Sequence, residues 1–523
     1  MNGADLLCDT LLANDVDVCF ANPGTSEMHF VAALDRKPQM RCVLGLFEGV
    51  VSGAADGYAR MAKKPAATLL HLGPGLGNAL ANLHNAKRAR TPMVNVVGDH
   101  ARHHLQHDAP LTSDIESIAR PMSHWVRRIG SPEGVGEDAG EAIAQARRQP
   151  GQISTLILPA DCAWTDLPEG TQARKVAPLA AALTDSDHVK TVARHMAAAR
   201  KAGKRVVLFM GPQAIEGEAA QVAGRIAQAT GVQLMTPTAF RRMQRGQGAV
   251  DIARLPYVVD LGTKALADCA ELILVGVNAP VAFFAYPGKA SEIAPASCEV
   301  RRLSRNDEDA LHALQALAEA LGVPAHGASV GAAPSIDLSA PSNGKLTSAA
   351  VNRLVLKALP EGAIVVDESV TSGREIAQLN MGAAPHDWLS TTGGAIGQGI
   401  PTAVGASVAC PTRQVVSMQA DGSGMYTCQG LWTQAREKLK VLTIVYANDT
   451  YAILHGEMQA VGTQEPGDNA RRMLDLDQPS LNWSQLAQAM GVPSRRVDTV
   501  EAFVDALKAG LAENGPFLIE ARI

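Results

Sequence analysis

The chain has 523 residues, of which 46% are hydrophobic and 19% charged, and its formal net charge is -5. This length predicts three or four domains, and the composition is that of a globular protein with a large core. A small negative charge gives no reason to expect nucleic acid or an anionic membrane surface as a partner.

The eight cysteines show neither a C-x-x-C pair nor the spacing of a metal site, and most lie in apolar runs. We therefore expect reduced core cysteines in a cytoplasmic protein. The first residues, MNGADLLCDTLLANDVD, include early acidic residues and no basic segment, so we expect no signal peptide. No apolar stretch reaches the roughly 20 residues of a membrane-spanning helix.

Short apolar runs alternate with amphipathic stretches along the whole chain. Such runs are typical of parallel strands that are buried on both faces. Helix-like segments, such as 216–230, lie between them, and the pattern predicts a repeated α/β fold. The predicted strands include 67–71, 93–97, 155–158, 206–210, 272–275, 363–366, 415–418 and 442–446.

Two stretches are interpreted as linkers between domains. They are 177–187 and 325–343, and the second is poor in large apolar residues. The linkers divide the chain into three segments, 1–176, 188–324 and 345–523.

The last segment carries the most informative pattern. Asp421 follows the predicted strand QVVSMQ, and Asn448 follows the next predicted strand, KVLTIVYA. In a β–α–β unit both would lie at the carboxyl edge of the sheet, where open α/β sheets bind ligands. A carboxylate, an amide oxygen and a carbonyl near Thr450 would suit Mg²⁺. Gly422 and Ser423 are predicted to open a helix that continues through the helix-like stretch 425–439, and its free N–H groups could hold phosphate oxygens. The structural alternative is an Asp cap followed by an Asn-Asp turn.

A second pattern, LGLFEGVVSGAADGYARM, lies in the first segment. Glu48 follows an apolar run and begins a predicted helix rich in small residues. A carboxylate among Leu46, Phe47, Val50 and Val51 is expected to be desolvated, which suits proton exchange near neutral pH. The structural alternative is a first-turn glutamate that interacts with the helix dipole.

Together these patterns resemble the thiamine diphosphate (ThDP) dependent family that includes benzoylformate decarboxylase, pyruvate decarboxylase and acetolactate synthase. The resemblance covers nearly the whole chain. Six matches occur in the expected order: NPGTSE, Glu48 with GYAR, LHLGPG with GN, DES, GGAIG, and ADGSG with NDTY. It implies three doubly wound, parallel-sheet α/β domains, namely pyrimidine-binding (1–176), central (188–324) and diphosphate-binding (345–523). It also implies a homodimer or homotetramer with active sites at subunit interfaces.

The resemblance further implies roles around the cofactor, which carries the difficult chemistry of making or breaking a bond beside the carbonyl of a small 2-oxo acid. Glu48 would hydrogen-bond the aminopyrimidine ring. The Gly394 carbonyl would accept from its exocyclic amine, and Ile396 would support the bent shape of the cofactor. The residues implied to hold Mg²⁺ are Asp421, Asn448 and Thr450, and the cofactor contacts also include Gly422, Ser423 and Tyr451.

His71 and Thr25 are predicted to face the substrate. His71 is similar in position to an active-site histidine of benzoylformate decarboxylase and could relay protons. Thr25 matches a hydroxyl near the substrate carboxylate. The structural alternative for His71 is a buried histidine at the end of a strand, satisfied by the backbone.

A run of histidines follows the next predicted strand and could line the mouth of the pocket. More often such a run is a solvated loop, and no carboxylate or cysteine nearby has the spacing of a metal site. The run comprises His100, His103, His104 and His107.

Some positions depart from the family pattern. Ala420 stands where the family usually has glycine, and Asp449, which replaces a second asparagine, would add negative charge near the diphosphate. The apolar stretch 279–286 lacks the second substrate-side histidine of benzoylformate decarboxylase, and 452–458 is expected to shape the pocket.

These departures leave alternatives open. Non-oxidative decarboxylation with carboligase activity is the main prediction. GPG at 73–75 resembles the acetolactate synthase branch, which also carries FAD, but the GP pair after VVLFM is too weak to indicate a flavin. A non-catalytic binding or regulatory subunit is the alternative of a different class, and the presence of Glu48, Asp421 and Asn448 argues against it.

Overall fold

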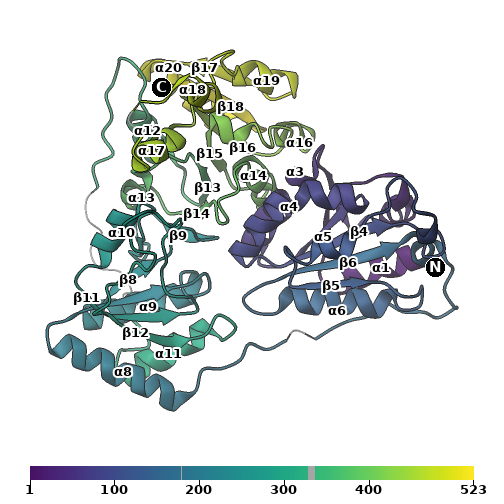
Figure 1. The fold of residues 1–523 in the computed structure, drawn as a ribbon, viewed down its shortest axis with the longest axis horizontal. Helices are drawn as coiled ribbons and strands as arrows, with labels where there is room; N and C mark the ends of the chain where they lie inside the picture. Colours follow the sequence, from purple (N-terminus) through teal and green to yellow (C-terminus); the bar gives the residue numbers. More distant parts are fainter. Residues whose placement is uncertain (178, 328–335, 464) are drawn as a thin grey trace.

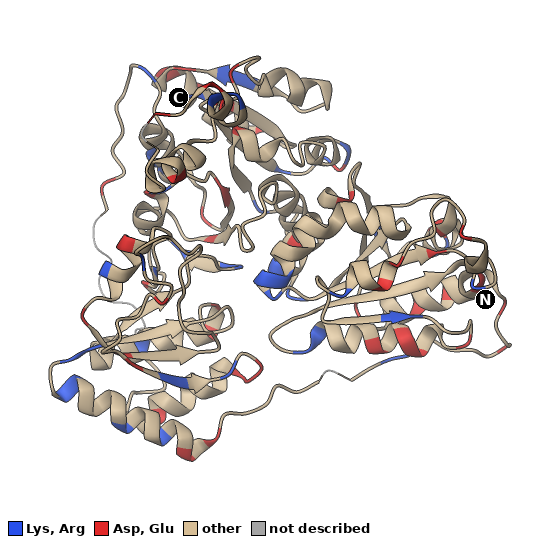
Figure 2. Ribbon diagram, in the orientation of Figure 1, with Lys and Arg blue, Asp and Glu red and all other residues tan. Residues whose placement is uncertain are grey.

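The computed structural model describes residues 1–177, 179–327, 336–463 and 465–523. Within them the chain forms three lobes, each built on a mostly parallel sheet covered by helices (Figure 1). Two predicted linkers connect the lobes, and parts of both, residues 178 and 328–335, lie outside the described residues. Charged residues of both signs are interspersed over the three lobes (Figure 2). In the described part of the chain, no helix combines the length and the apolar character needed to span a membrane.

The first lobe contains a fully parallel sheet with strand order β2-β1-β3-β4-β6-β5. The polar residues that follow β1, β3 and β4 therefore share one edge. The strands are β1 Val18–Asn22, β2 Arg41–Leu44, β3 Ala66–Leu70, β4 Met93–Asp99, β5 Trp125–Arg128 and β6 Ile153–Pro159. The helices are α1 Gly3–Ala13, η1 Thr25–Glu27, α2 Met28–Asp35, α3 Glu48–Ala62, α4 Leu72–Ala89, η2 Leu105–His107, α5 Ile115–Ala119, α6 Val135–Arg147 and α7 Ala160–Trp164.

The central lobe contains a smaller parallel sheet with strand order β10-β8-β7-β11-β12. The strands are β7 Arg205–Met210, β8 Gln233–Thr236, β10 Ala253–Arg254, β11 Cys269–Val275 and β12 Glu299–Ser304. The helices are α8 Ser186–Lys201, α9 Gly217–Thr230, α10 Val259–Leu266 and α11 Ala310–Ala320.

The third lobe contains a sheet with strand order β17-β18-β16-β15-β13-β14-β9. Its strands are β13 Ala363–Glu368, β14 His386–Ser390, β15 Val415–Ala420, β16 Val441–Ala447, β17 Ser494–Val497 and β18 Phe517–Arg522, to which the antiparallel β9 Met243–Arg245 is added. Its helices are α12 Ser348–Ala358, α13 Ile376–Leu379, η3 Asn380–Gly382, α14 Gly399–Ala409, α15 Asp421–Gly424, α16 Gly430–Arg436, α17 Ala452–Ala460, α18 Asp468–Leu474, α19 Trp483–Ala489 and α20 Val500–Ala512.

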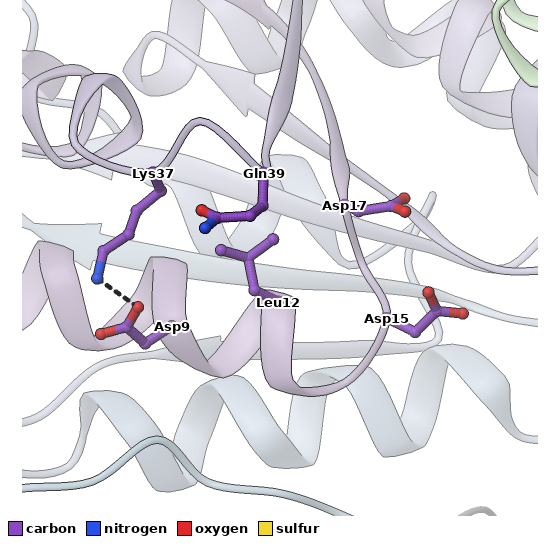
Figure 3. A pocket seen from close by; sticks show the side chains of 6 residues that line it. All are labelled: Asp9, Leu12, Asp15, Asp17, Lys37 and Gln39. Atoms are coloured by element: carbon purple, nitrogen blue, oxygen red, sulfur yellow. Dashed lines mark ion pairs between the residues drawn. The ribbon is translucent and has the colours of Figure 1, made fainter.

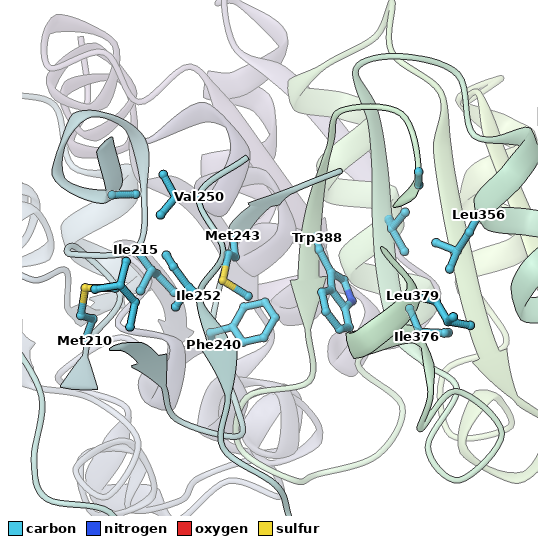
Figure 4. Packing of buried hydrophobic residues seen from close by; sticks show 14 of the residues in the cluster. Met210, Ile215, Phe240, Met243, Val250, Ile252, Leu356, Ile376, Leu379 and Trp388 are labelled. Carbon is cyan, nitrogen blue, oxygen red and sulfur yellow. The ribbon is translucent and has the colours of Figure 1, made fainter. Parts of the chain in front are cut away.

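Strand β9 belongs by sequence to the central segment but extends the sheet of the third lobe. Phe240, just before β9, packs edge-on against Trp388 of β14, with ring centroids 5.3 Å apart (Figure 4). Both side chains are buried in one apolar cluster that spans the central and third lobes. This junction fixes the central lobe against the sheet that carries Asp421.

Helices α3 and α14 join the first lobe to the third, and small residues explain how closely they approach. A β-carbon at Gly405 would collide with the backbone of Ala54, and one at Gly57 would collide with the backbone of Thr402. Dense backbone contact of this kind requires glycine and alanine, which accounts for their abundance in both helices.

The predicted strands are all present, with small shifts at their ends. One helix is shorter than predicted: after Asp421 the chain makes only the four-residue α15, then turns before α16. The prediction of core cysteines was right for most of them, but Cys42 is exposed.

Candidate active site

Glu48 is the first residue of α3 and is 7% exposed. Its Oε2 accepts a hydrogen bond of 2.9 Å from Nδ2 of Asn78 on α4. A β-carbon at Gly75 would lie 3.4 Å from Oε1, so the turn that opens α4 passes close to the carboxylate. The exposed Leu46 lies two residues earlier. The structure therefore presents a largely buried carboxylate at the carboxyl edge of the first sheet.

His71 directly follows β3, as predicted, and is paired with a residue that the sequence did not single out. Its Nδ1 lies 2.8 Å from Oε2 of Glu27, whose side chain is fully buried. Gly24 N also donates to this oxygen at 2.8 Å. Because a carboxylate only accepts, Nδ1 is the donor in this contact, and Nε2 takes no part in it.

The hydroxyl that approaches His71 belongs to Ser26 rather than to Thr25. Ser26 Oγ lies 3.2 Å from His71 Nδ1 and also donates to Glu27. Thr25 is exposed, and no hydrogen bond joins it to His71 within the described residues. The only available signal was the position of Ser26 and Glu27 inside the NPGTSE loop.

Asp421 directly follows β15, begins α15 and is 2% exposed. Its Oδ2 accepts from the backbone N–H groups of Asn448 at 2.9 Å and Asp449 at 2.8 Å, and its Oδ1 accepts from Gly422 N at 2.8 Å. Burial raises the pKa of Asp421, against the opposing effect of these backbone donors. Since β15 and β16 are neighbours in the sheet, Asp421 and Asn448 meet at one edge as predicted.

Near Asp421 lie further oxygen atoms of the kind that coordinate a hard cation. Asn448 Oδ1 is close to the backbone and accepts from Thr450 N at 3.2 Å, while the Thr450 hydroxyl turns away to Asp475 Oδ1 at 3.0 Å. Carboxylate, amide and carbonyl oxygens each keep lone pairs in this arrangement. The donor set therefore fits a cation such as Mg²⁺ bound together with a phosphate.

The extra negative charge of Asp449 is neutralised, contrary to our expectation that it would act on the diphosphate. Its backbone is left-handed, with φ 57°, and its side chain is held by Arg522 at the end of β18. Arg522 Nη1 donates to Oδ1 at 2.8 Å, and Nη2 donates to Oδ2. The hydrogen bond from Arg522 holds the pKa of Asp449 below its usual value.

Gly422, Ser423 and Tyr451 surround the same turn. The predicted helix is interrupted after α15 and resumes only at α16, and the N–H of Gly422 is directed at Asp421 Oδ1. The ring of Tyr451 packs where a side chain at 422 would lie. Ser423 Oγ accepts from Gln419 Nε2 at 2.7 Å.

Gly394 and Ile396 lie in the turn between β14 and α14. Gly394 is exposed with φ 81°, and Ile396 is half-buried. A β-carbon at Gly394 would lie 2.8 Å from the ring of Phe283, so the apolar stretch of the central lobe reaches this turn. Tyr286 donates to Glu457 on α17 at 2.7 Å, which ties that stretch to the third lobe.

The histidine run after β4 is mostly exposed, in agreement with the solvated-loop interpretation. The rings of His100, His104 and His107 contact one another in sequence at tilted angles, with centroids 5.5 Å apart. Among the described residues, no group of three or more His, Cys, Asp or Glu side chains is arranged to hold a metal ion.

Two hollows lie elsewhere. One is lined by Asp15, Asp17 and Lys37 (Figure 3). Asp17 directly precedes β1, so this hollow lies at the amino end of the strands, whereas His71 follows the carboxyl end of β3. The other lies between the first and central lobes, where Arg60 and Arg241 already donate to Asp56 and Glu216. Neither contains the chemical groups described above.

The fold and these two sets of residues define a class of protein. Residues 1–118 match the model of the thiamine pyrophosphate enzyme N-terminal TPP binding domain, and residues 371–521 match that of the C-terminal TPP binding domain. The chain belongs to the thiamine pyrophosphate enzyme family.

Particular relatives are similar along their whole length. The chain is 50% identical to "Putative acetolactate synthase large subunit IlvX" of Mycobacterium tuberculosis, covering 99% of this chain and 98% of that protein. It is 28% identical to benzoylformate decarboxylase of Pseudomonas aeruginosa, with 98% and 97% covered. A solved structure of a Rhodococcus jostii ThDP-dependent 4-hydroxybenzoylformate decarboxylase superposes with a TM-score of 0.85 at 25% identity, covering 100% and 99%.

Proposed function

We propose that the chain catalyses ThDP- and Mg²⁺-dependent, non-oxidative decarboxylation of a 2-oxo acid, with carboligase activity on a second carbonyl compound. The Glu27–His71 pair beside the buried Glu48 is the observation that carries this proposal. When bound, ThDP supplies a nucleophilic carbon and an electron sink for breaking the bond to the carboxylate.

The residues of the chain bind and orient in this proposal. Glu48, fixed by Asn78, would hydrogen-bond the aminopyrimidine ring. Asp421, Asn448 and the Thr450 carbonyl would hold Mg²⁺ on the diphosphate. The remaining contacts to the cofactor would come from Gly394, Ile396, Gly422, Ser423 and Tyr451.

Proton transfer falls to His71 in this proposal. With Nδ1 held by Glu27, Nε2 would give a proton to, or take one from, the oxygen of the reacting carbonyl. Ser26, which contacts both His71 and Glu27, would help to hold the imidazole in this orientation. Thr25, which is exposed, would approach the substrate carboxylate.

We further propose that each active site combines two copies of the chain in a homodimer or homotetramer. Exposed apolar side chains flank both halves: Leu46 beside Glu48 is 48% exposed, and Tyr426 near Asp421 is 55% exposed. A partner surface would cover them. Mixing Glu48→Gln chains with Asp421→Ala chains tests this, because only sites shared between chains can regain activity in mixed dimers. Activity that stays absent in verified mixed dimers would contradict shared sites.

Acetolactate synthase-type carboligation of pyruvate is the second candidate. The relative that is 50% identical bears that name, and the apolar Phe283 lies at the turn where a second proton-transferring side chain is missing. A transferase of this type could also bind FAD.

Incubation with ThDP, Mg²⁺ and a panel of 2-oxo acids tests the proposal. Release of CO₂ with an equimolar aldehyde supports the decarboxylase, whereas acetolactate from pyruvate supports the synthase, and a yellow protein indicates flavin. Glu48→Gln should abolish turnover while ThDP still binds. Unchanged turnover in this variant would refute the mechanism, and a wild-type protein without turnover on the panel would favour a non-catalytic subunit.

A further inference from the structure

Helix α4 lies between the rest of the first lobe and the third lobe (Figure 1). It carries a row of asparagines whose side chains contact α3 and the turn 393–397. Asn78, Asn82 and Asn85 are spaced by four and three residues, so they lie on one face of the helix. Asn78 contacts Glu48, and Asn85 contacts the turn that carries Gly394. The three asparagines therefore connect Glu48 with the turn that carries Gly394.

Asn82 is the middle asparagine of the row, and its side-chain amide contacts both α3 and the turn 393–397. It is 2% exposed, and its Nδ2 donates to Gly49 O at 2.8 Å and to Gly397 O at 3.2 Å. Gly49 follows Glu48 in α3, and Gly397 follows Ile396 in the turn. Asn82 Oδ1 accepts from Asn85 Nδ2 at 2.9 Å, so the side chain has a partner at every polar atom.

Asn85 extends this connection along the turn. Its Oδ1 accepts from Gly393 N at 3.1 Å and Ala395 N at 3.2 Å, and its Nδ2 donates to Ala395 O at 2.8 Å. His84 Nε2 lies 3.1 Å from Gly393 O. A β-carbon at Gly393 would collide with Asn85, so the helix and the turn are in direct contact.

The other side of the turn is held by Glu368, which is buried at the end of β13. Its carboxylate accepts from the N–H groups of Gly397 at 2.9 Å, Gln398 at 3.1 Å and Gly399 at 2.8 Å. With one side anchored in the third lobe, the turn is joined to the first lobe by the α4 asparagines, by the α3–α14 packing, and by the hydrogen bonds from Gln398 to Asp56 and from Arg60 to Thr392. Of these, Asn82 is the contact that touches both the residue after Glu48 and the turn itself.

We propose that Asn82 is a positioning residue that sets Glu48 and the turn 393–397 as one unit. The inference rests on the proposed function, in which Glu48 and the turn of one chain serve two different active sites. Asn82 then couples the two sites through one buried side chain, in addition to the packing of α3 on α14.

A mixed dimer with one live site tests this. If one chain carries Glu48→Gln, the live site combines Glu48 of the wild-type chain with the turn of the variant chain. We expect Asn82→Ala in either chain to lower kcat of the live site roughly tenfold to hundredfold with KM little changed, because either placement misplaces one half of the site. Loss from one placement only, or from neither, would overturn the proposal.

Hydrogen exchange of the cofactor-free protein supplies a second readout. Asn82→Ala should speed exchange both in a peptide covering 48–53 and in one covering 393–400. Asn82→Asp, which keeps the shape but turns the donor into an acceptor facing two carbonyls, should do the same. If neither folds, Asn82→Ser carries the test. Faster exchange in only one of the two peptides would contradict the coupling.

Asn14→Ala is the matched control. Asn14 is 3% exposed and also donates to two carbonyls, Thr10 O at 2.8 Å and Arg174 O at 2.7 Å, but these lie away from the site. It should lower thermal stability without changing kcat or exchange in either peptide. Failure of the proposed function is separately visible, because Glu48→Gln dimers would then keep their turnover whatever residue occupies position 82.

Discussion

Asn78 Nδ2 donates to Glu48 Oε2 at 2.9 Å, joining the second turn of α4 to the first residue of α3. We expect Asn78→Ala to lower kcat about tenfold, since a hydrogen bond to a charged group contributes roughly 1.5–3 kcal/mol. Asn78→Asp should lower it further, because it places a second carboxylate against the first. Steady-state kinetics at saturating ThDP and Mg²⁺ measures both. Equal activity of the two variants and the wild type would show that Asn78 does not orient Glu48.

The Glu27–His71 pair gives a graded prediction. His71→Ala removes the proton-transfer group, and we expect kcat to fall about 10²- to 10⁴-fold. Glu27→Gln keeps the shape but not the charge, so it should give a smaller loss. Ser26→Ala should change kcat least. Steady-state assays of kcat with the preferred 2-oxo acid rank the three variants. A Glu27→Gln enzyme as active as wild type would show that Glu27 has no part in the mechanism.

Arg522 neutralises Asp449, which directly precedes Thr450 and Tyr451. We expect Arg522→Ala to weaken ThDP binding in the presence of Mg²⁺ about tenfold, because it frees a negative charge near the diphosphate. Adding Asp449→Asn should restore most of the affinity. Titration calorimetry of the cofactor-free protein measures both. A double variant as weak as Arg522→Ala would show that packing, rather than charge, is responsible.

Asp387 supports the junction of the central and third lobes by accepting from Arg242 at 2.8 Å and Arg413 at 2.6 Å. Burial opposes ionisation, but the two arginines prevail and hold the pKa of Asp387 below its usual value. Its contribution to stability is thus present above the ordinary carboxyl range and is lost as pH falls through the folded-state pKa.

Asp387→Asn should therefore cost roughly 1–3 kcal/mol of unfolding free energy at neutral pH. The difference from wild type should shrink on acidification below the usual aspartate range. Urea denaturation at a series of pH values measures this, with Asp187→Asn, at an 85% exposed carboxylate, as the control that should change little. If the difference in unfolding free energy between wild type and Asp387→Asn grew as the pH fell, the proposed role of the ionised Asp387 would be contradicted.

Local patterns in the sequence were sufficient for the strands and for the positions of three candidate site residues. Glu48, Asp421 and Asn448 each stand where an apolar run stops, and parallel strands bring such positions to one edge of a sheet. The prediction for the helix behind Gly422 was wrong because the chain turns at Met425–Gln429 before α16 begins.

By itself the sequence determined the α/β class, the strands and the residues at their carboxyl ends, because alternation of apolar and polar residues is a property of neighbouring positions. Only the tertiary structure decided that Glu27 holds His71, that Arg522 neutralises Asp449, and that Asn82 joins α3 to the turn before α14. These pairs are separated by 44, 73 and 315 residues, so they depend on strand order and lobe packing, which no local pattern encodes.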